Sequence, residues 1–286
     1  QSILSGIRHL AWPLLFLSSG LILWFGFKYQ KPVIAFNLSY AWIIGWLLLL
    51  ERTIPFRRKW RKSDGQLGPD LGHTILTKSL VQLLIISTLG LGFVQPPFTT
   101  PLSTSPTWIQ VALGLVMSEF ALYWTHRLAH EWPLIWRFHS VHHSVKRLWI
   151  VNTGRFHFVD SLLSVLAGIL VLFALGVSMD AIIWVSAITA YIGILTHCNA
   201  DLQCGWWNYV FNTPNLHRWH HSTDSLISNK NYGENLMCWD MLFGTYLHRP
   251  CENVAEIGIS ERMPATFTEQ LIVPFIWTRY QSTKVT

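Results

Sequence analysis

Residues 161–196 read SLLSVLAGILVLFALGVSMDAIIWVSAITAYIGILT, two apolar stretches separated by the short turn GVSMD at 176–180. A helix rises about 1.5 Å per residue, so stretches of roughly 16–20 residues approach or cover the roughly 30 Å hydrocarbon core of a bilayer. We therefore expect a tight helical hairpin that spans a membrane. Further apolar stretches of similar length precede it, at 10–27, 33–50, 75–94 and 108–125. The sequence predicts an all-α integral membrane bundle of about four to six transmembrane helices.

The composition of the 286-residue chain supports this fold class. Hydrophobic residues make up 51%, charged residues only 13%, and the mean hydropathy is +0.31. These values exclude a disordered chain and are typical of a membrane protein rather than a soluble enzyme. The four cysteines form no CxxC pair, which argues against a disulfide framework. The net charge of +6 lies beside apolar stretches, so it indicates membrane topology and not a nucleic-acid partner.

The distribution of Lys and Arg predicts the orientation in the membrane. A basic cluster occupies 52–62, and Lys and Arg accumulate on the cytoplasmic side of membrane proteins. We therefore expect the cluster to be cytoplasmic and, because successive loops alternate between the two sides, 95–107 to be outside. Lys28 and Lys31 then also fall outside, but they carry less positive charge than the cluster. Segments 126–160 and 197–286 fall inside, and they hold eleven of the 13 histidines. The predicted protein is thus multi-pass, with its histidines gathered on the cytoplasmic face in a helical cap.

Three units follow from this topology. Residues 1–125 form transmembrane helices with a basic cytoplasmic loop at 51–73; the first stretch lacks a small-residue cleavage site, so we expect an anchor rather than a cleaved signal. Residues 126–250 form the histidine-rich region, which includes the hairpin 161–196. Residues 251–286 form an interfacial tail, because its apolar run QLIVPFIW is too short to span and contains Pro274.

The histidines occur in motifs with metal-ligand spacing. HRLAH occupies 126–130, HSVHH occupies 139–143, HRWHH occupies 217–221, and His197 ends the last apolar stretch. Spacing i, i+4 puts two imidazoles on one helix face, close enough to bind one metal ion. In each HxxHH motif we expect the first two histidines to share a face and the third to join them. Isolated His9, His73 and His248 are interpreted as structural or interfacial.

Nine clustered histidines exceed what one tetrahedral zinc ion needs, so the sequence predicts a histidine-ligated dimetal site. Imidazole suits zinc, copper, iron and nickel alike, and ligand type therefore does not choose the metal. A membrane-facing site with few carboxylates favours oxidation of a lipid over hydrolysis of a soluble substrate.

The three motifs, in this order and beside these stretches, resemble the fatty acid hydroxylase and sterol desaturase superfamily of membrane non-haem diiron enzymes, in its bacterial branch. The likeness runs from about residue 118 to 247. It extends to SEFALYWTHR (118–127), HCN (197–199), VFNTP (210–214), NKNYG (229–233) and WDMLFGTY (239–246). The resemblance implies that residues 126–250 are the catalytic region and that nine residues are iron ligands: His126, His130, His139, His142, His143, His197, His217, His220 and His221.

Three further candidate residues lie where the chain departs from the motifs of this superfamily or directly beside them. Members of that superfamily show an HPxE element where this chain has HFVD at 157–160, so His157 is either a further ligand or a residue that supports one. Arg127 and Arg218 each follow a histidine of the motifs directly. They could bind acidic groups or lipid headgroups, or lie at the solvated surface.

Two polar residues are candidates for supporting the metal ligands. Glu119 lies inside an apolar stretch, where an acid is costly and usually functional, and it precedes His126 by seven residues. We expect its carboxylate to accept a hydrogen bond from a ligand imidazole, with an inter-helix pair as the alternative. Asn199 could support a ligand or a metal-bound water, or could hydrogen-bond to backbone.

The resemblance implies an oxidoreductase that uses two iron ions and O2 to oxidise an unactivated C–H bond of a membrane lipid. Hydroxylation is favoured, and desaturation with the same ligands is the alternative. We expect zinc to be able to replace iron during purification. Electrons should come from an external ferredoxin-, rubredoxin- or cytochrome b5-type donor, because the chain has no iron–sulfur or flavin motif.

Two other classes of function remain open. A histidine-rich metal transporter would place its site near the bilayer midplane, whereas these histidines lie at the ends of the apolar stretches. A membrane zinc hydrolase would carry a motif such as HExxH, which is absent from the sequence.

Overall fold

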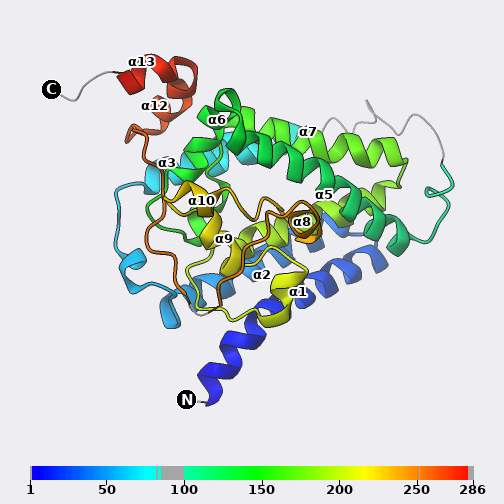
Figure 1. The fold of residues 1–286 in the computed structure, drawn as a ribbon. Helices are drawn as coiled ribbons and strands as arrows, with labels where there is room; N and C mark the ends of the chain where they lie inside the picture. The colour runs from blue at the N-terminus through cyan, green and yellow to red at the C-terminus, as the bar shows by residue number, and fades with distance from the viewer. Residues whose placement is uncertain (1, 82, 85–99, 251, 283–286) are drawn as a thin grey trace.

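The computed structural model describes residues 2–81, 83–84, 100–250 and 252–282, and their regular structure is helical (Figure 1). Five long helices are α1 (Ser2–Lys28), α2 (Pro32–Thr53), α5 (Thr107–Glu131), α7 (Phe158–Leu175) and α8 (Met179–Thr196). The shorter helices are η1 (Arg58–Arg61), α3 (Leu67–Gly72), η2 (His73–Ser79), α6 (Pro133–His143), η3 (Ile150–Gly154), η4 (Gly205–Tyr209), α9 (Pro214–His220), α10 (Ser225–Ser228), α11 (Cys238–Leu242), α12 (Phe267–Ile272), η5 (Val273–Ile276) and α13 (Trp277–Ser282). Among these residues the only β-type pairing consists of three isolated bridges, so the predicted all-α class is confirmed.

The predicted hairpin is formed by α7 and α8. α7 ends at Gly176, whose φ of 64° is a left-handed conformation that glycine adopts without strain. Its N–H donates to the carbonyl oxygens of Leu172 and Phe173, which closes the last turn of the helix. Ser178 then caps α8, because its hydroxyl accepts from the N–H of Ala181. The turn chemistry of GVSMD therefore ends one helix and starts the next within three residues.

Among the described residues, four helices are long and apolar enough to cross a membrane: Ile3–Lys28, α2, α7 and α8. Only 22% to 50% of each apolar segment is buried inside the protein, and side chains such as Leu14 and Leu170 point outward. Helices whose outer faces are apolar are stable in acyl chains, where their backbone groups are satisfied internally. α5 overlaps the expected span 108–125 but falls outside this set of four. The expected span 75–94 lies mostly outside the described residues.

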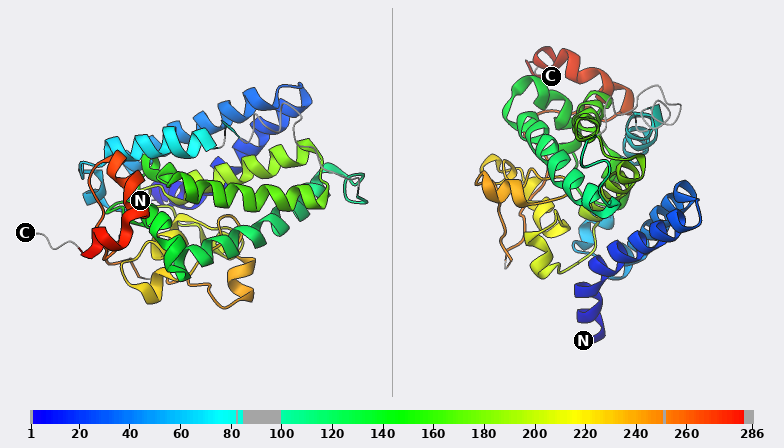
Figure 2. Two further views of the ribbon diagram at one scale, coloured as in Figure 1. Left: turned by 90° about the horizontal axis from the view of Figure 1, so that it is seen from above. Right: turned by 90° about the vertical axis from the view of Figure 1, so that its right-hand side faces the viewer.

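The long helices pack side by side (Figure 2), with α8 against α1, α2 and α5, and with α7 against α5. α1 and α2 form one antiparallel pair, whose buried Trp12 and Ile43 belong to the same hydrophobic cluster as Tyr191 of α8. α5 and α7 form a second cluster with α8 through Leu115 and Val185. α8 therefore connects the two halves of the bundle.

The segments that surround the histidines meet at one end of this bundle. Arg8, near the start of α1, pairs with Asp201 after α8 at an Nε–Oδ2 distance of 3.1 Å. Arg147, after α6, donates to the carbonyl oxygen of Lys62 in the basic loop at 3.0 Å. The turn between α7 and α8 lies at the opposite end (Figure 1). The loops that charge distribution assigns to one membrane face do share one end of the structure.

Candidate metal centre

A bend between α5 and α6 brings the first two motifs together. Trp132 ends α5 in an extended conformation, with φ −104° and ψ 113°, as the residue before a proline prefers. Pro133 then begins α6 at the position where its missing N–H is harmless. HRLAH lies on the last turns of α5 and HSVHH on the last turns of α6, so both motifs face the same interior.

The remaining histidines come from the other side of this interior. His197 follows the last residue of α8. HRWHH occupies α9, a seven-residue helix that begins at Pro214, and His221 directly follows it. The site therefore combines residues from four helices that are far apart in the sequence.

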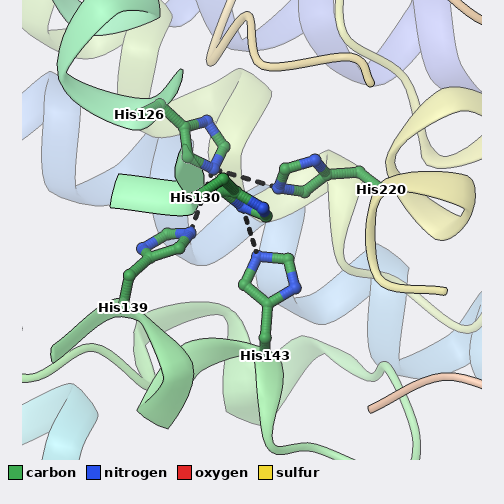
Figure 3. A group of neighbouring side chains, drawn as sticks. All are labelled: His126, His130, His139, His143 and His220. Carbon is green, nitrogen blue, oxygen red and sulfur yellow. Dashed lines mark hydrogen bonds between the residues drawn. The ribbon is translucent and has the colours of Figure 1, made fainter. Parts of the chain in front are cut away.

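The nine predicted ligands gather in two groups. Within each group the potential ligand nitrogens lie within 4.8 Å of one another. The five-histidine group, drawn in Figure 3, consists of His126, His130, His139, His143 and His220. The four-histidine group consists of His142, His197, His217 and His221.

Each HxxHH motif contributes to both groups, which the sequence did not predict. His139 and His143 belong to the five-histidine group, while His142 between them belongs to the other. In HRWHH the pattern is reversed, with His217 and His221 in the four-histidine group and His220 in the five-histidine group. On a helix with about 100° per residue, i+4 lies about 40° to one side of i and i+3 about 60° to the other. The expectation that the three histidines of a motif act on one face was wrong for this reason.

The Nε2 atoms of the histidines point at one another. In the five-histidine group, Nε2–Nε2 distances are 3.1 Å for His126–His139, 3.1 Å for His130–His143 and 3.0 Å for His220–His126 (Figure 3). In the four-histidine group they are 3.2 Å for His197–His142, 3.0 Å for His217–His197 and 3.1 Å for His221–His217. Both groups are thus arranged around a point that the Nε2 atoms share.

The opposite ring nitrogens determine the protonation of these imidazoles. Six of the Nδ1 atoms lie against an oxygen atom that can accept: Tyr232 O for His126 (2.6 Å), Asn229 Oδ1 for His130 (3.2 Å), Asp160 Oδ2 for His139 (2.9 Å), Arg155 O for His142 (3.2 Å), Gly193 O for His197 (3.1 Å) and Lys230 O for His220 (2.8 Å). Because these oxygens only accept, Nδ1 carries the proton and Nε2 carries a lone pair.

Three of the close Nε2 pairs have both rings fixed in this way: His126–His139, His126–His220 and His142–His197. Two lone pairs about 3 Å apart repel each other, and neither nitrogen has a proton to donate. A cation between them turns this repulsion into coordination, and a metal-bound histidine ordinarily donates its other N–H to an acceptor. The arrangement fits a metal ion in each group.

Burial keeps several of the imidazoles neutral, His142, His197 and His220 among them. Eight of the nine are buried, and His130 is partly exposed. Loss of hydration lowers the pKa of His220 to about 3 and the pKa of His197 to about 4, and it holds the pKa of His142 well below its ordinary value. A neutral imidazole is the form that binds a metal, so these three histidines need to lose no proton at pH 7 before they can do so.

Comparison with known proteins assigns the family. The sequence model of the fatty acid hydroxylase family matches residues 111–245. The chain is 41% identical over 282 residues to the ornithine lipid hydroxylase OlsE of Rhizobium tropici, a match that covers 95% of this chain and 85% of the relative. The chain belongs to the fatty acid hydroxylase family. It is accordingly an oxidoreductase of that family.

More distant relatives of this fatty acid hydroxylase family member act on other lipids. Human alkylglycerol monooxygenase is 28% identical over 196 residues, which cover 65% of this chain and 41% of the relative. The Delta(7)-sterol 5(6)-desaturase erg3B of Aspergillus fumigatus is 27% identical over 144 residues, which cover 49% of this chain and 40% of the relative. No solved structure matches.

Glu119 does not meet an imidazole in this family member, contrary to expectation. Its Oε1 accepts from the backbone N–H of Asn235 at 2.9 Å, and its Oε2 accepts from the side-chain amide of the same residue at 2.6 Å. The segment that contains Asn235 reaches α5 and takes both carboxylate oxygens. Glu119 therefore fixes the loop whose Tyr232 carbonyl accepts from His126, and it acts on the ligand through that loop.

Of the two roles considered for Asn199 from the sequence, support of a ligand or a water and hydrogen bonding to backbone, the structure shows the second. Its Oδ1 accepts from the N–H of Arg57 at 3.0 Å, and its Nδ2 donates to the carbonyl oxygen of Arg57 at 3.1 Å. Its own N–H donates to Glu51 at 2.8 Å. The side chain thus mimics a β-bridge partner and joins the basic loop to the end of α8.

His157 lies outside both groups. Its Nδ1 accepts from the N–H of Val159 and caps the start of α7, and its Nε2 lies 3.1 Å from the carbonyl oxygen of Leu271 as donor. Both ring nitrogens are occupied by backbone groups, and neither is directed at another histidine.

The sequence did not single out the groups that orient the histidines. Asp160 is the clearest case, because its buried carboxylate lies 2.9 Å from Nδ1 of His139. A signal was present, since this acid ends the HFVD element at 157–160. The carbonyl oxygens of Lys230 and Tyr232 left no such signal, because every residue carries a carbonyl.

Proposed function

We propose that this protein is a membrane lipid hydroxylase that uses O2 and two iron ions to hydroxylate an unactivated C–H bond. The observation that carries the proposal is the convergence of buried Nε2 lone pairs in two adjoining groups. From the 41% identity to an ornithine lipid hydroxylase over nearly the whole chain, we infer that the substrate is an ornithine lipid or a closely similar aminolipid.

The donor set fits the proposed metal pair. All nine donors are imidazoles, which suit iron, and equally zinc, so that zinc can occupy the site in purified protein. Iron ions bound there would supply the activation of O2 and the transfer of electrons to it. The protein's own residues orient the histidines: Asp160 and the backbone carbonyl oxygens fix the imidazole rings by hydrogen bonds. Phe156 stacks on His142 at a ring distance of 3.9 Å and covers that ligand from water.

The experiment that tests this function compares lipid extracts from cells that express the protein with those from cells that express His220→Ala, grown under 18O2. Hydroxylation adds one labelled oxygen atom to a lipid, whereas desaturation removes two hydrogen atoms and adds no label. The likeness to a sterol desaturase makes the second outcome the alternative. The proposed function is wrong if iron-loaded, reduced wild-type protein and the His220→Ala protein give the same lipids.

We also propose that the metal centre faces the cytoplasm and that an external ferredoxin-, rubredoxin- or cytochrome b5-type protein supplies electrons there. The basic loop supports this orientation, and it lies at the same end of the bundle as the site. Single cysteines at exposed positions Lys59 and Leu226 should be labelled from the cytoplasmic side of oriented vesicles, and one at Thr104 from the other side. Labelling of 226 and 104 from the same side would contradict the topology.

The division of the chain remains a proposal of the same kind. We propose residues 1–125 as membrane anchor, 126–250 as catalytic region and 251–286 as an interfacial tail. Support for the tail comes from its exposed apolar side chains, Ile272, Phe275 and Ile276, beside the polar anchor Gln270, which contacts His73. Such a face is suited to the boundary between headgroups and acyl chains.

A further inference from the structure

A cavity of about 410 Å³ lies behind the metal centre. α9 separates the two, because His217, His220 and His221 point to the metal groups while Arg218 and Trp219 line the cavity. Its wall continues through His9, near the start of α1, and through Arg249. Since His9 belongs to a helix that is long and apolar enough to span a membrane, the cavity adjoins the N-terminal end of such a helix.

Arg218 gives this cavity an unusual charge. The side chain is only 2% exposed, and its guanidinium lies over the ring of Phe56 at 3.8 Å. Its Nη2 donates to the carbonyl oxygens of Cys198 at 3.1 Å and Ala200 at 2.7 Å. Its Nε is buried without a hydrogen-bond partner among the described residues, and none of their carboxylates forms an ion pair with it. This excludes the solvated surface role considered from the sequence, and it leaves a buried cation that forms no direct ion pair with a described carboxylate, although Asp201 and Glu51 attract it electrostatically.

The carboxylates near Arg218 bind other groups; Glu51, for example, accepts from the backbone N–H groups of Ile150 and Asn199. Arg57 lies over the same Phe56 ring at 5.7 Å and donates to the carbonyl oxygen of Ala255 at 2.9 Å. Two carboxylates also line the cavity, and each already has an arginine partner: Asp201 pairs with Arg8 at 3.1 Å, and Glu252 pairs with Arg249 at 3.2 Å. Among the described residues, two arginines, Arg218 and Arg249, line the cavity together with these two carboxylates, and Arg8 and Arg57 adjoin its lining residues Asp201 and Phe56.

We propose that this cavity binds an oxyanion, a carboxylate or a phosphate, of the kind that a lipid headgroup presents at the membrane edge. A guanidinium offers planar, paired donors that match such a group, and Arg218 lines the cavity. Arg249 supplies a second cation at the cavity wall, and Asn215 supplies an amide. The inference goes beyond the proposed function and does not depend on it, because binding is measurable without turnover.

The test uses full-length protein in phosphatidylcholine nanodiscs, with and without phosphatidylglycerol, and measures retained lipid by native mass spectrometry. A second arm titrates inorganic phosphate alone and follows tryptophan fluorescence, which Trp219 makes sensitive to the cavity. Arg249→Gln is the main variant, because this residue is partly exposed and its loss leaves the buried Arg218 in place. Arg58→Gln removes an exposed arginine from the basic loop at the same membrane end and is the matched control.

We expect Arg249→Gln to weaken binding of the anionic lipid by about tenfold, the effect of one charge-assisted hydrogen bond, and Arg58→Gln to leave it unchanged. Binding of phosphatidylglycerol but not of phosphate would identify a lipid headgroup as the occupant. Arg249-dependent binding of phosphate as well would identify the free oxyanion as sufficient. Equal binding by wild-type and Arg249→Gln protein, or an equal loss in Arg58→Gln, would overturn the proposal. Metal content and lipid oxidation, measured on the same samples, report on the proposed function separately.

Discussion

Replacing Asp160 by Asn should weaken metal binding without unfolding the protein. The carboxylate lies 2.9 Å from Nδ1 of His139, and both side chains are almost fully buried. Asn keeps the shape and can still present a neutral oxygen, so the change removes only the charge from this hydrogen bond. A charge-assisted hydrogen bond contributes about 1.5–3 kcal/mol, and loss of a ligand's outer partner lowers metal affinity by about 10–100-fold. These two magnitudes agree, since about 1.4 kcal/mol is tenfold.

The assay is the rate and extent of metal loss to a chelator, followed by elemental analysis of the protein that remains. Asp180→Asn is the matched control, because Asp180 also lies in the first turn of a hairpin helix but is exposed. The Asp180→Asn protein therefore shows how much of any effect comes from losing the interaction between an acid and the helix dipole. If Asp160→Asn retains metal as wild-type protein and Asp180→Asn do, the idea that this carboxylate orients His139 is refuted.

Three further outcomes are expected. Gly233→Ala should lower both the melting temperature and the metal content, because a Cβ there would lie 2.3 Å from the carbonyl oxygen of Leu236; unchanged values would contradict the close packing of this loop. His157→Asn should retain about two metal ions per chain by elemental analysis, because His157 lies outside both histidine groups and Asn can also cap α7. Loss of one ion would show that His157 is a ligand. Metal-free protein should lose thermal stability as the pH falls from about 6.5 to about 4. The pKa of His197 is lowered to about 4 in the folded protein, so the unfolded chain takes up its proton at a higher pH than the folded chain does. A melting temperature that stays constant over this range would contradict the burial of His197.

The fold was readable from the sequence where local chemistry decides it. The apolar lengths predicted four of the six expected spans, GVSMD predicted the turn that Gly176 makes, and the basic loop predicted which segments share an end. The acceptors that orient the histidines could not be predicted from the sequence, because the oxygens of Lys230 and Tyr232 belong to the backbone. Only the packing of their loop against α5, which Glu119 fixes through Asn235, places them beside the histidines. Patterns of side chains predict which residues can bind a metal, and the fold decides what holds them.

The division of each HxxHH motif between two groups explains why the chain uses three histidines in five residues. The i and i+4 rings turn toward one histidine group and the i+3 ring toward the other, so one short helix contributes to both. The two motifs do this with opposite assignments, and their rings meet between the groups: His143 stacks on His221 at 4.3 Å, and His217 stacks on His220 at 5.2 Å. A movement of α6 or α9 would therefore displace histidines of both groups together. The HxxHH spacing is thus the register that would hold two metal ions at a fixed separation, one in each group.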